Sequence, residues 1–167
     1  MPLVKNGAPA EDPFVAVADD APLPDGPALI SAARLLAEDA ALAGRNGPLG
    51  VVWPNSRDVA ELAPFLPRLD LVALEFPKFR DGRAYSQARL LRERHGFKGE
   101  LRAVGNVLRD QVLLMLRAGF DAFAFDKDAD AAAFGAAAST YSVFYQPTGD
   151  GRTTARDARR ALAKAGG

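Results

Sequence analysis

Short apolar runs alternate along the chain with longer segments in which apolar residues recur every three or four positions. The runs that predict strands span 14–18, 27–31, 49–53, 69–76, 101–104, 120–125 and, finally, 142–145. Helical spacing follows most of them, at 31–44, 84–95, 106–119 and from Asp128 or Asp130 to about 141. The helix expected after 49–53 is short or broken, because Pro64 and Pro67 lie within it.

This order of elements predicts an α/β fold with a mainly parallel sheet and covering helices. The 167 residues suit one domain that needs no metal or disulfide for its core. We place that domain at 1–146, with an N-terminal extension at 1–26 and a polar tail at 147–167 that is mobile or only partly helical. The units are too few for a complete eight-stranded barrel, which leaves an open sheet, the favoured form, or a part-barrel of βα units.

Composition and charge exclude several functional classes. The 21 basic and 21 acidic residues balance, so the net charge indicates neither a nucleic acid nor an anionic membrane as partner. The chain has no cysteine, which excludes a disulfide framework, a thiolate metal site and a cysteine nucleophile. The first residues lack the long apolar core of a signal peptide and no apolar run approaches the roughly 20 residues of a membrane span, so we expect a cytoplasmic protein.

The segment that opens the helix at 84–95 carries the first candidate site. Lys78, Arg80 and Arg83 follow a strand there, and they could bind an oxyanion together with backbone N–H groups. Tyr85 could donate to the same ligand, although a tyrosine at this place in a helix is more often a packing residue. The alternative is a turn at Asp81 in which the two arginines pair with Asp81, Glu75 or solvent.

Glu75 lies near the end of the apolar run at 69–76, whose other charged residue, Asp70, lies at its start. At the end of such a strand, desolvation would raise the pKa of its carboxyl group and suit it to act as a general base near neutral pH. The alternative is a structural ion pair with Lys78, Arg80 or Arg102, which would keep the carboxylate ionised.

The second candidate site follows the run at 101–104. Asn106 and Arg109 could bind an anion beside helix N-terminal amides, or Asn106 could cap the helix while Arg109 and Asp110 form a surface pair. His95 is the single histidine and lies at a predicted helix end, so no histidine-based triad or multi-histidine site can form.

Cofactor and metal motifs do not occur in the chain. No G-x-G-x-x-G follows a strand and no P-loop is present, so we predict no nucleotide cofactor. Asp126, Asp128 and Asp130 alternate like part of a calcium loop, but the required glycine and terminal glutamate are missing. We therefore predict no metal.

The segments EFPKFRDGRAYSQARLLRERHGFKGELRAVGNVLRDQ and RAGFDAF closely resemble the bacterial domain of unknown function 934 family, whose members are described as probable oxidoreductases involved in sulfite reduction. The resemblance is strong across 70–125 and extends more weakly from ADDAPLPDGPALIS to Tyr145. It implies a role beside sulfite reductase in sulfur assimilation, and it supplies no catalytic residues. The family pattern usually has Asp at Asn106 and Cys at Ala118, so neither an aspartate-dependent proton transfer nor a thiol step is expected at those positions.

Three functions fit these observations. The first is an accessory protein of sulfite reduction that binds a small oxyanion or sulfite reductase itself. The second is an enzyme acting on a small anionic metabolite, with Glu75 as base and arginines as anion ligands. The third is a protein-interaction module that exposes an apolar patch of Phe76, Phe79 and Tyr85. The sequence leaves open whether the protein is an enzyme, and it indicates nothing about the oligomeric state.

Overall fold

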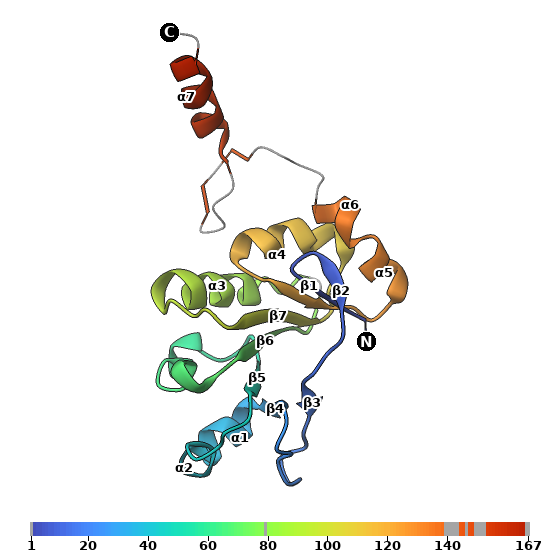
Figure 1. Ribbon diagram of the computed structural model, residues 1–167, viewed down its shortest axis with the longest axis vertical. Helices are drawn as coiled ribbons and strands as arrows, with labels where there is room; N and C mark the ends of the chain where they lie inside the picture. The colour runs from blue at the N-terminus through green and yellow to red at the C-terminus, as the bar shows by residue number, and fades with distance from the viewer. Residues whose placement is uncertain (1, 79, 139–143, 146, 149–152, 166–167) are drawn as a thin grey trace.

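The computed structural model describes residues 2–78, 80–138, 144–145, 147–148 and 153–165 (Figure 1). In this part of the chain one sheet of 8 strands has the order β2-β1-β8-β7-β6-β5-β4-β3. The strands are β1 (Leu3–Lys5), β2 (Ala8–Ala10), β3 (Val15–Ala16), β4 (Ala28–Ser31), β5 (Leu49–Trp53), β6 (Leu71–Phe76), β7 (Glu100–Gly105) and β8 (Ala122–Ala124).

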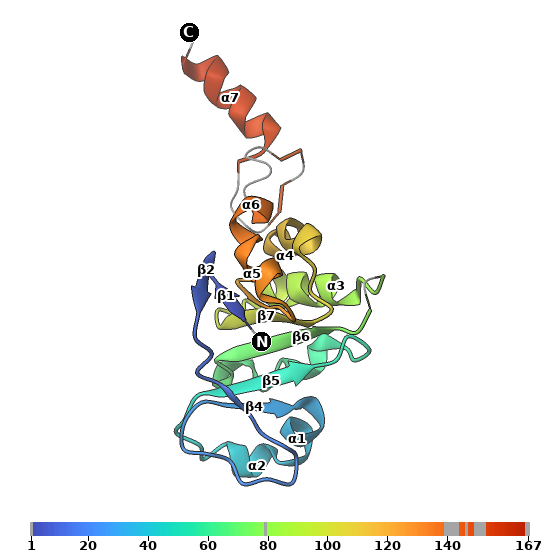
Figure 2. The same cartoon turned by 90° about the vertical axis from the view of Figure 1, so that its right-hand side faces the viewer.

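The strands from β3 to β8 are parallel and lie side by side in chain order. Because the order never reverses, right-handed connections bring the covering helices to the same face of the sheet. The sheet curls as half of a barrel does (Figure 2). The predicted α/β class and mainly parallel sheet are confirmed, and the part-barrel form describes this arrangement.

The predicted helices form as short segments. The α-helices are α1 (Ala32–Ala37), α2 (Asp39–Leu42), α3 (Arg83–Arg89), α4 (Val112–Ala118), α5 (Asp128–Ala132), α6 (Phe134–Ala138) and α7 (Ala155–Ala165). The 3-10 helices are η1 (Val59–Leu62), η2 (Leu66–Arg68) and η4 (Arg109–Gln111), and η3 (Leu90–Arg94) is a π-helical turn that continues α3.

Local chemistry explains several of these boundaries. The Ser31 hydroxyl accepts from the backbone N–H of Arg34 and caps α1. Asp58 caps η1 in the same way, and the prolines that follow keep this region in short 3-10 helices. Gly119 ends α4 with a φ of 108°. The strand predicted at 142–145 falls largely outside the described residues.

Residues 1–26, which the sequence indicated as an extension, contribute three strands to the sheet. The turn between β1 and β2 uses Asn6 and Gly7, both with positive φ. β1 pairs antiparallel with β8, while β3 pairs parallel with β4 at the other side of the sheet. Residues 11–14 therefore join the two ends of the sheet, and they lie beside Arg102 of β7.

One main core lies between the sheet and the helices. Trp53, Leu74 and Phe76 point from the strands into it, where they join Leu91 and Met115 from the helical layer. The other face of the sheet carries several small residues, including Gly50, Ala73, Ala122 and Ala124. At Gly50 a Cβ would lie 2.8 Å from the Leu71 side chain, so small residues allow the strands to curl.

Burial corrects one of the sequence-based hypotheses. Phe76 is 1% exposed and packs against Tyr85 and Phe120, so it does not belong to an exposed apolar patch. Phe79, the second member of that predicted patch, lies outside the described residues.

The C-terminal helix α7 projects away from the sheet and its covering helices in both views (Figures 1 and 2). Its start is capped by Thr154, whose Oγ1 accepts from the Asp157 N–H and donates to the Asp157 carboxylate. Hydrogen bonding to Thr154 lowers the pKa of Asp157. Among the described residues no helix has both the length and the apolar character needed to cross a bilayer.

Candidate functional site

The carboxyl ends of β5, β6 and β7 lead into neighbouring loops, which we call the carboxyl rim. Phe76 pairs with Gly105 at the ends of β6 and β7, and the Asn106 N–H donates to the Phe76 carbonyl at 2.7 Å. This bond holds Asn106 beside the start of the loop that carries Lys78. Parallel α/β proteins bind ligands at this edge, and the fold brings two of the predicted residues together there.

The start of α3 carries the most organised polar contacts of the rim. The Arg83 guanidinium donates from Nε and Nη2 to the two carboxylate oxygens of Asp81, at 2.9 and 2.6 Å. This pair lowers the pKa of Asp81 and raises that of Arg83. The side-chain amide of Asn55 also faces Asp81 and adds to the lowering. Arg83 therefore forms the ion pair with Asp81 that the sequence offered as the alternative to an oxyanion site.

The remaining cations of this loop are open to solvent. Lys78 and Arg80 are exposed, and their side chains make no hydrogen bond or ion pair with the described residues. Gly82 occupies the N-cap of α3 without a side-chain cap, and the first turn contains no acidic residue. Asp81, just before this N-cap, accepts from the Arg83 N–H at 3.4 Å and offsets the charge of Arg83, so Lys78 and Arg80 are the cations of this loop left to attract an anion.

Glu75 lies on the opposite face of β6 from Phe76 and is half-buried. Its carboxylate makes no hydrogen bond or ion pair with the described residues. The predicted alternative of an ion pair with Lys78, Arg80 or Arg102 is wrong in this structure, because Arg102 is occupied by Asp12 and Glu100.

Asn106, in the loop after β7, does not cap a helix, although the sequence offered that role as one alternative. The N-cap residue of η4 is Leu108 and that of α4 is Gln111. Arg109 is exposed and lies 3.4 Å from Asp110, which matches the surface pair that the sequence offered as an alternative. Exposed pairs of this kind contribute little to stability, so Arg109 is free to exchange Asp110 for a ligand.

Tyr85 points away from the rim and into the helical layer. Its ring meets that of Phe76 edge to face, with centroids 5.2 Å apart. The Tyr85 Oη is buried without a hydrogen-bond partner, and burial raises the pKa of the hydroxyl. Tyr85 is thus a packing residue, and its protonated hydroxyl group donates no hydrogen bond to the described residues.

Buried polar atoms at the end of β5 were missed by sequence reasoning. Trp53 Nε1, Asn55 Nδ2 and Gln87 Oε1 are buried and make no hydrogen bond of normal geometry. Gln87 also donates to the carbonyls of Pro54 and Arg57, at 3.2 and 2.8 Å, and so ties α3 to this loop. The sequence did contain a signal, because Gln87 lies beside the apolar positions of the predicted helix and a buried glutamine side chain needs several hydrogen-bond partners.

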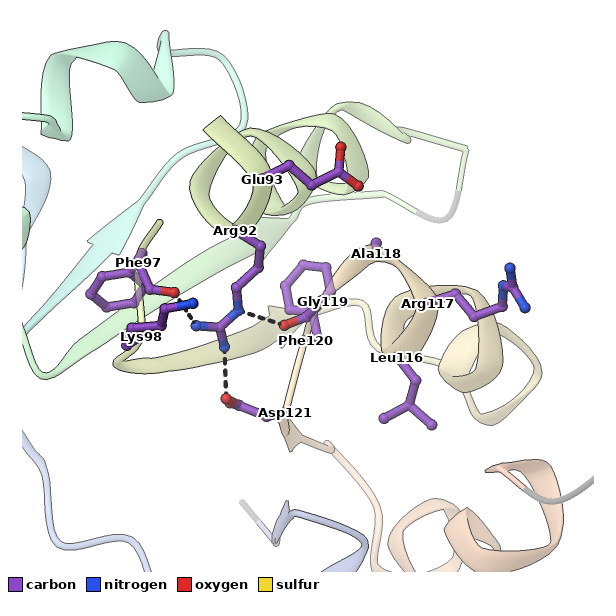
Figure 3. Close-up of a pocket in the computed structure, with 10 residues that line it drawn as sticks. All are labelled: Arg92, Glu93, Phe97, Lys98, Leu116, Arg117, Ala118, Gly119, Phe120 and Asp121. Carbon is purple, nitrogen blue, oxygen red and sulfur yellow. Dashed lines mark hydrogen bonds and ion pairs between the residues drawn. The ribbon is translucent and has the colours of Figure 1, made fainter. Parts of the chain in front are cut away.

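A pocket of about 530 Å³ lies at the opposite edge of the sheet (Figure 3). At its centre Arg92 donates to the carbonyls of Phe97, Gly99 and Gly119 and, at 2.7 Å, to the Asp121 carboxylate. These contacts join the π-helical turn to the segments that enter β7 and β8. Burial raises the pKa of Asp121, an effect that hydrogen bonds from the Leu101 N–H and from Arg92 partly offset.

The chemistry of this pocket is mainly structural. The Arg92 side chain already has a carbonyl or carboxylate partner for each of its nitrogens. Gly119 permits this arrangement, since a Cβ at that position would lie 2.6 Å from the Arg92 side chain. Contacts at the amino ends of parallel strands usually serve stability. The carboxyl rim is therefore the better candidate site.

No group of three or more His, Asp or Glu side chains able to hold a metal ion is found in the described part of the chain. None of the curated proteins matches the chain. A family model described as "Bacterial protein of unknown function (DUF934)" matches residues 50–156, a span that begins at the second residue of β5 and contains β6 to β8, the rim loops and the Arg92 pocket. The chain therefore belongs to this DUF934 family of bacterial proteins.

Proposed function

We propose that this protein is a cytoplasmic accessory protein of assimilatory sulfite reduction, which binds a small oxyanion at the carboxyl rim and acts with sulfite reductase. The pathway comes from the resemblance of residues 70–125 to proteins described in those terms. The proposed oxyanion binding rests on the cationic side chains of the carboxyl rim. The observation that carries it is the start of α3, where Arg83 follows an N-cap without a side-chain acceptor and two exposed cations precede it.

Three features support an anion at this place. Helix N-terminal amides and the helix dipole favour negative charge. Lys78 and Arg80 have no partner among the described residues, so binding an anion breaks no contact of theirs. Asp81 holds Arg83 at the helix start by two hydrogen bonds, which orients the guanidinium before a ligand arrives.

Isothermal titration of the purified protein with sulfite, and separately with sulfate, tests the binding. Removing both exposed cations in Lys78→Ala/Arg80→Ala should weaken binding at least about tenfold, because charge-assisted hydrogen bonds contribute about 1.5–3 kcal/mol each. Arg94→Ala is the matched control, since Arg94 is exposed at the far end of the same helical segment. Equal affinities of the double variant and the control for sulfite would show that the rim does not bind the oxyanion.

Growth tests the pathway separately. A strain that lacks the gene should fail on sulfate and on sulfite and grow on sulfide or cysteine. The plasmid-borne gene should restore growth, and the Lys78→Ala/Arg80→Ala version should not. Equal growth of the deletion strain on all four sulfur sources would contradict the proposed pathway.

A further inference from the structure

An apolar groove of about 600 Å³ is lined by residues of α3, α4 and the segment beyond α6, and its lining includes none of Lys78, Arg80 and Arg83. We call it the α3–α4 groove. Its walls include Tyr85 and Arg89 of α3, Leu114 and Arg117 of α4, and Phe144 and Tyr145 beyond α6. The groove plays no part in the oxyanion site, so it calls for a separate explanation.

Apolar side chains in the groove are exposed to an unusual degree. Leu114 is 61% exposed, although α4 already buries Val112, Met115 and Ala118 on its core face. Tyr145 is 90% exposed. A large aliphatic and an aromatic side chain exposed in one concave surface are typical of a protein-interaction site.

The charge around these apolar residues is positive. Arg89 is paired with Glu93 at 3.4 Å, and both side chains are about half exposed, so this pair is weak and can be replaced. The Arg117 guanidinium lies over the Phe144 ring at 4.0 Å from its centroid. The arginines thus flank an apolar floor, which favours carboxylates on the molecule that fills it.

Helix α7 begins beside the groove and is basic. The backbone N–H of Ala155, at the start of α7, donates to the carbonyl of Phe144 in the groove wall at 2.7 Å. α7 carries Arg156, Arg159, Arg160 and Lys164 against the single acidic residue Asp157. The whole chain has no net charge, so this concentration of basic residues on a helix that starts at the groove wall is local.

The Tyr85 hydroxyl adds a specific polar contact. Its Oη is buried, lacks a hydrogen-bond partner, and belongs to a residue that lines the groove. An unpaired buried hydroxyl is unfavourable, and an acceptor brought by a bound partner would satisfy it.

We propose that the α3–α4 groove binds an amphipathic segment of a partner protein, which places apolar side chains on Leu114 and carboxylates beside Arg89. A second copy of this chain is a poorer occupant, because its projecting α7 is basic like the groove. A lipid surface is also poorer, because Leu162 is the one large apolar side chain described on α7.

Fluorescence anisotropy of a labelled, designed helical peptide tests this directly. The probe has leucines at i, i+3, i+4 and i+7 and glutamates at its other positions. One control peptide has lysine for every glutamate, and another has alanine for every leucine. The acidic peptide should bind the full-length protein at least about tenfold more tightly than either control, and added salt should weaken its binding.

Protein variants locate the binding surface. Leu114→Glu should weaken binding of the acidic peptide at least about tenfold. Val15→Glu should leave it unchanged, since Val15 is 59% exposed on β3, outside the groove. Arg89→Glu should weaken the acidic peptide and strengthen the lysine peptide, and Tyr85→Phe should weaken the acidic peptide without changing the helical content.

Three results would overturn the proposal. The first is equal binding of the acidic and lysine peptides. The second is an acidic peptide that binds Leu114→Glu as tightly as the parent protein. The third is failure of the acidic peptide to bind while vesicles of phosphatidylglycerol bind in a manner that depends on Leu114, which would assign the surface to lipid instead.

Discussion

Arg102 of β7 forms a two-pronged ion pair with Asp12, with N–O distances of 2.6 and 2.9 Å, and so fastens the N-terminal segment to the middle of the sheet. Arg102 is 2% exposed and also donates to Glu100 at 2.7 Å. Burial opposes its charge, but the two carboxylates outweigh this effect and raise the pKa of the guanidinium. The pair joins residues 90 positions apart and holds the connection between β2 and β3 in place.

Replacing Asp12 by alanine should destabilise the protein by about 2 kcal/mol, since it removes two charge-assisted hydrogen bonds from a buried arginine that keeps Glu100 as a partner. Urea unfolding followed by tryptophan fluorescence measures this loss. Asp20→Ala is the control, because Asp20 is exposed and its side chain has no partner among the described residues. Equal midpoints for the two variants would show that the pair does not fasten the segment.

Arg92→Ala should lower the free energy of unfolding by about 2–4 kcal/mol, because it leaves the Asp121 carboxylate and three carbonyls without their donor. Arg92→Lys should recover less than half of the loss, because a single ammonium group cannot reach all four acceptors. Thermal and urea unfolding measure both values. Arg94→Ala, two residues away and exposed, should stay within about 0.5 kcal/mol of the parent protein.

The pH dependence of stability should distinguish two aspartates. The pKa of Asp121 is raised by burial, so its favourable contribution is complete below about pH 3.9 and is lost as the pH rises through the folded pKa. The pKa of Asp81 is lowered by Arg83, so its contribution is present above about pH 3.9 and is lost as the pH falls.

Urea unfolding of the parent protein, Asp121→Asn and Asp81→Asn between about pH 3 and 7 tests these opposite signs. The stability of the parent relative to Asp121→Asn should fall as the pH rises. Relative to Asp81→Asn it should increase. Parallel curves for the two variants would contradict the assignment of either pKa shift.

The repeating pattern predicted most of the sheet because parallel strands buried on both faces are apolar throughout. The run at 49–53 became β5 at the same residues, and the run at 69–76 contains β6. β1 and β2 were not predicted, although Asn6–Gly7 is a strong hairpin signal between their short apolar segments. Each of these strands has 3 residues, so their apolar pattern is weak, and they depend on pairing with β8.

The sequence indicated which residues follow the strands and was less informative about their contacts. Lys78 and Asn106, which the sequence assigned to two candidate sites, lie at the same edge because they follow adjacent parallel strands. The partner of Arg102 was not predictable, since Asp12 lies far away in the chain and no local pattern links the two residues. The direction in which Tyr85 points was also not predictable, because it depends on its packing against Phe76.

Asp81→Asn should tighten oxyanion binding at the rim by about threefold, because removing the negative charge beside Arg83 outweighs the loss of one of the two hydrogen bonds that orient its guanidinium. The gain should shrink as the salt concentration rises. Asp157→Asn in α7 makes the same change in net charge away from the rim and should leave the affinity unchanged. Sulfite titrations at low and high salt measure both effects, and an equal gain in the two variants would point to net charge alone.

Gly105→Ala should destabilise the protein by about 2–3 kcal/mol and weaken oxyanion binding, because two separate penalties meet at this residue. Its φ of +86° is unfavourable for a side chain, and an added Cβ would lie 2.7 Å from the Phe76 carbonyl oxygen. That same oxygen accepts the hydrogen bond from the Asn106 N–H, so relieving the clash would separate the two rim loops.

Gly96→Ala is the matched control for this prediction. Gly96 has a φ of +65°, but no atom lies within 4 Å of an added Cβ, so only the backbone penalty of about 1 kcal/mol remains. The free energy of unfolding measured in urea should therefore be lower for Gly105→Ala than for Gly96→Ala, and the sulfite affinity should change in Gly105→Ala alone. Equal losses of stability with unchanged affinity in both would show that the close approach of β6 and β7 does not organise the rim.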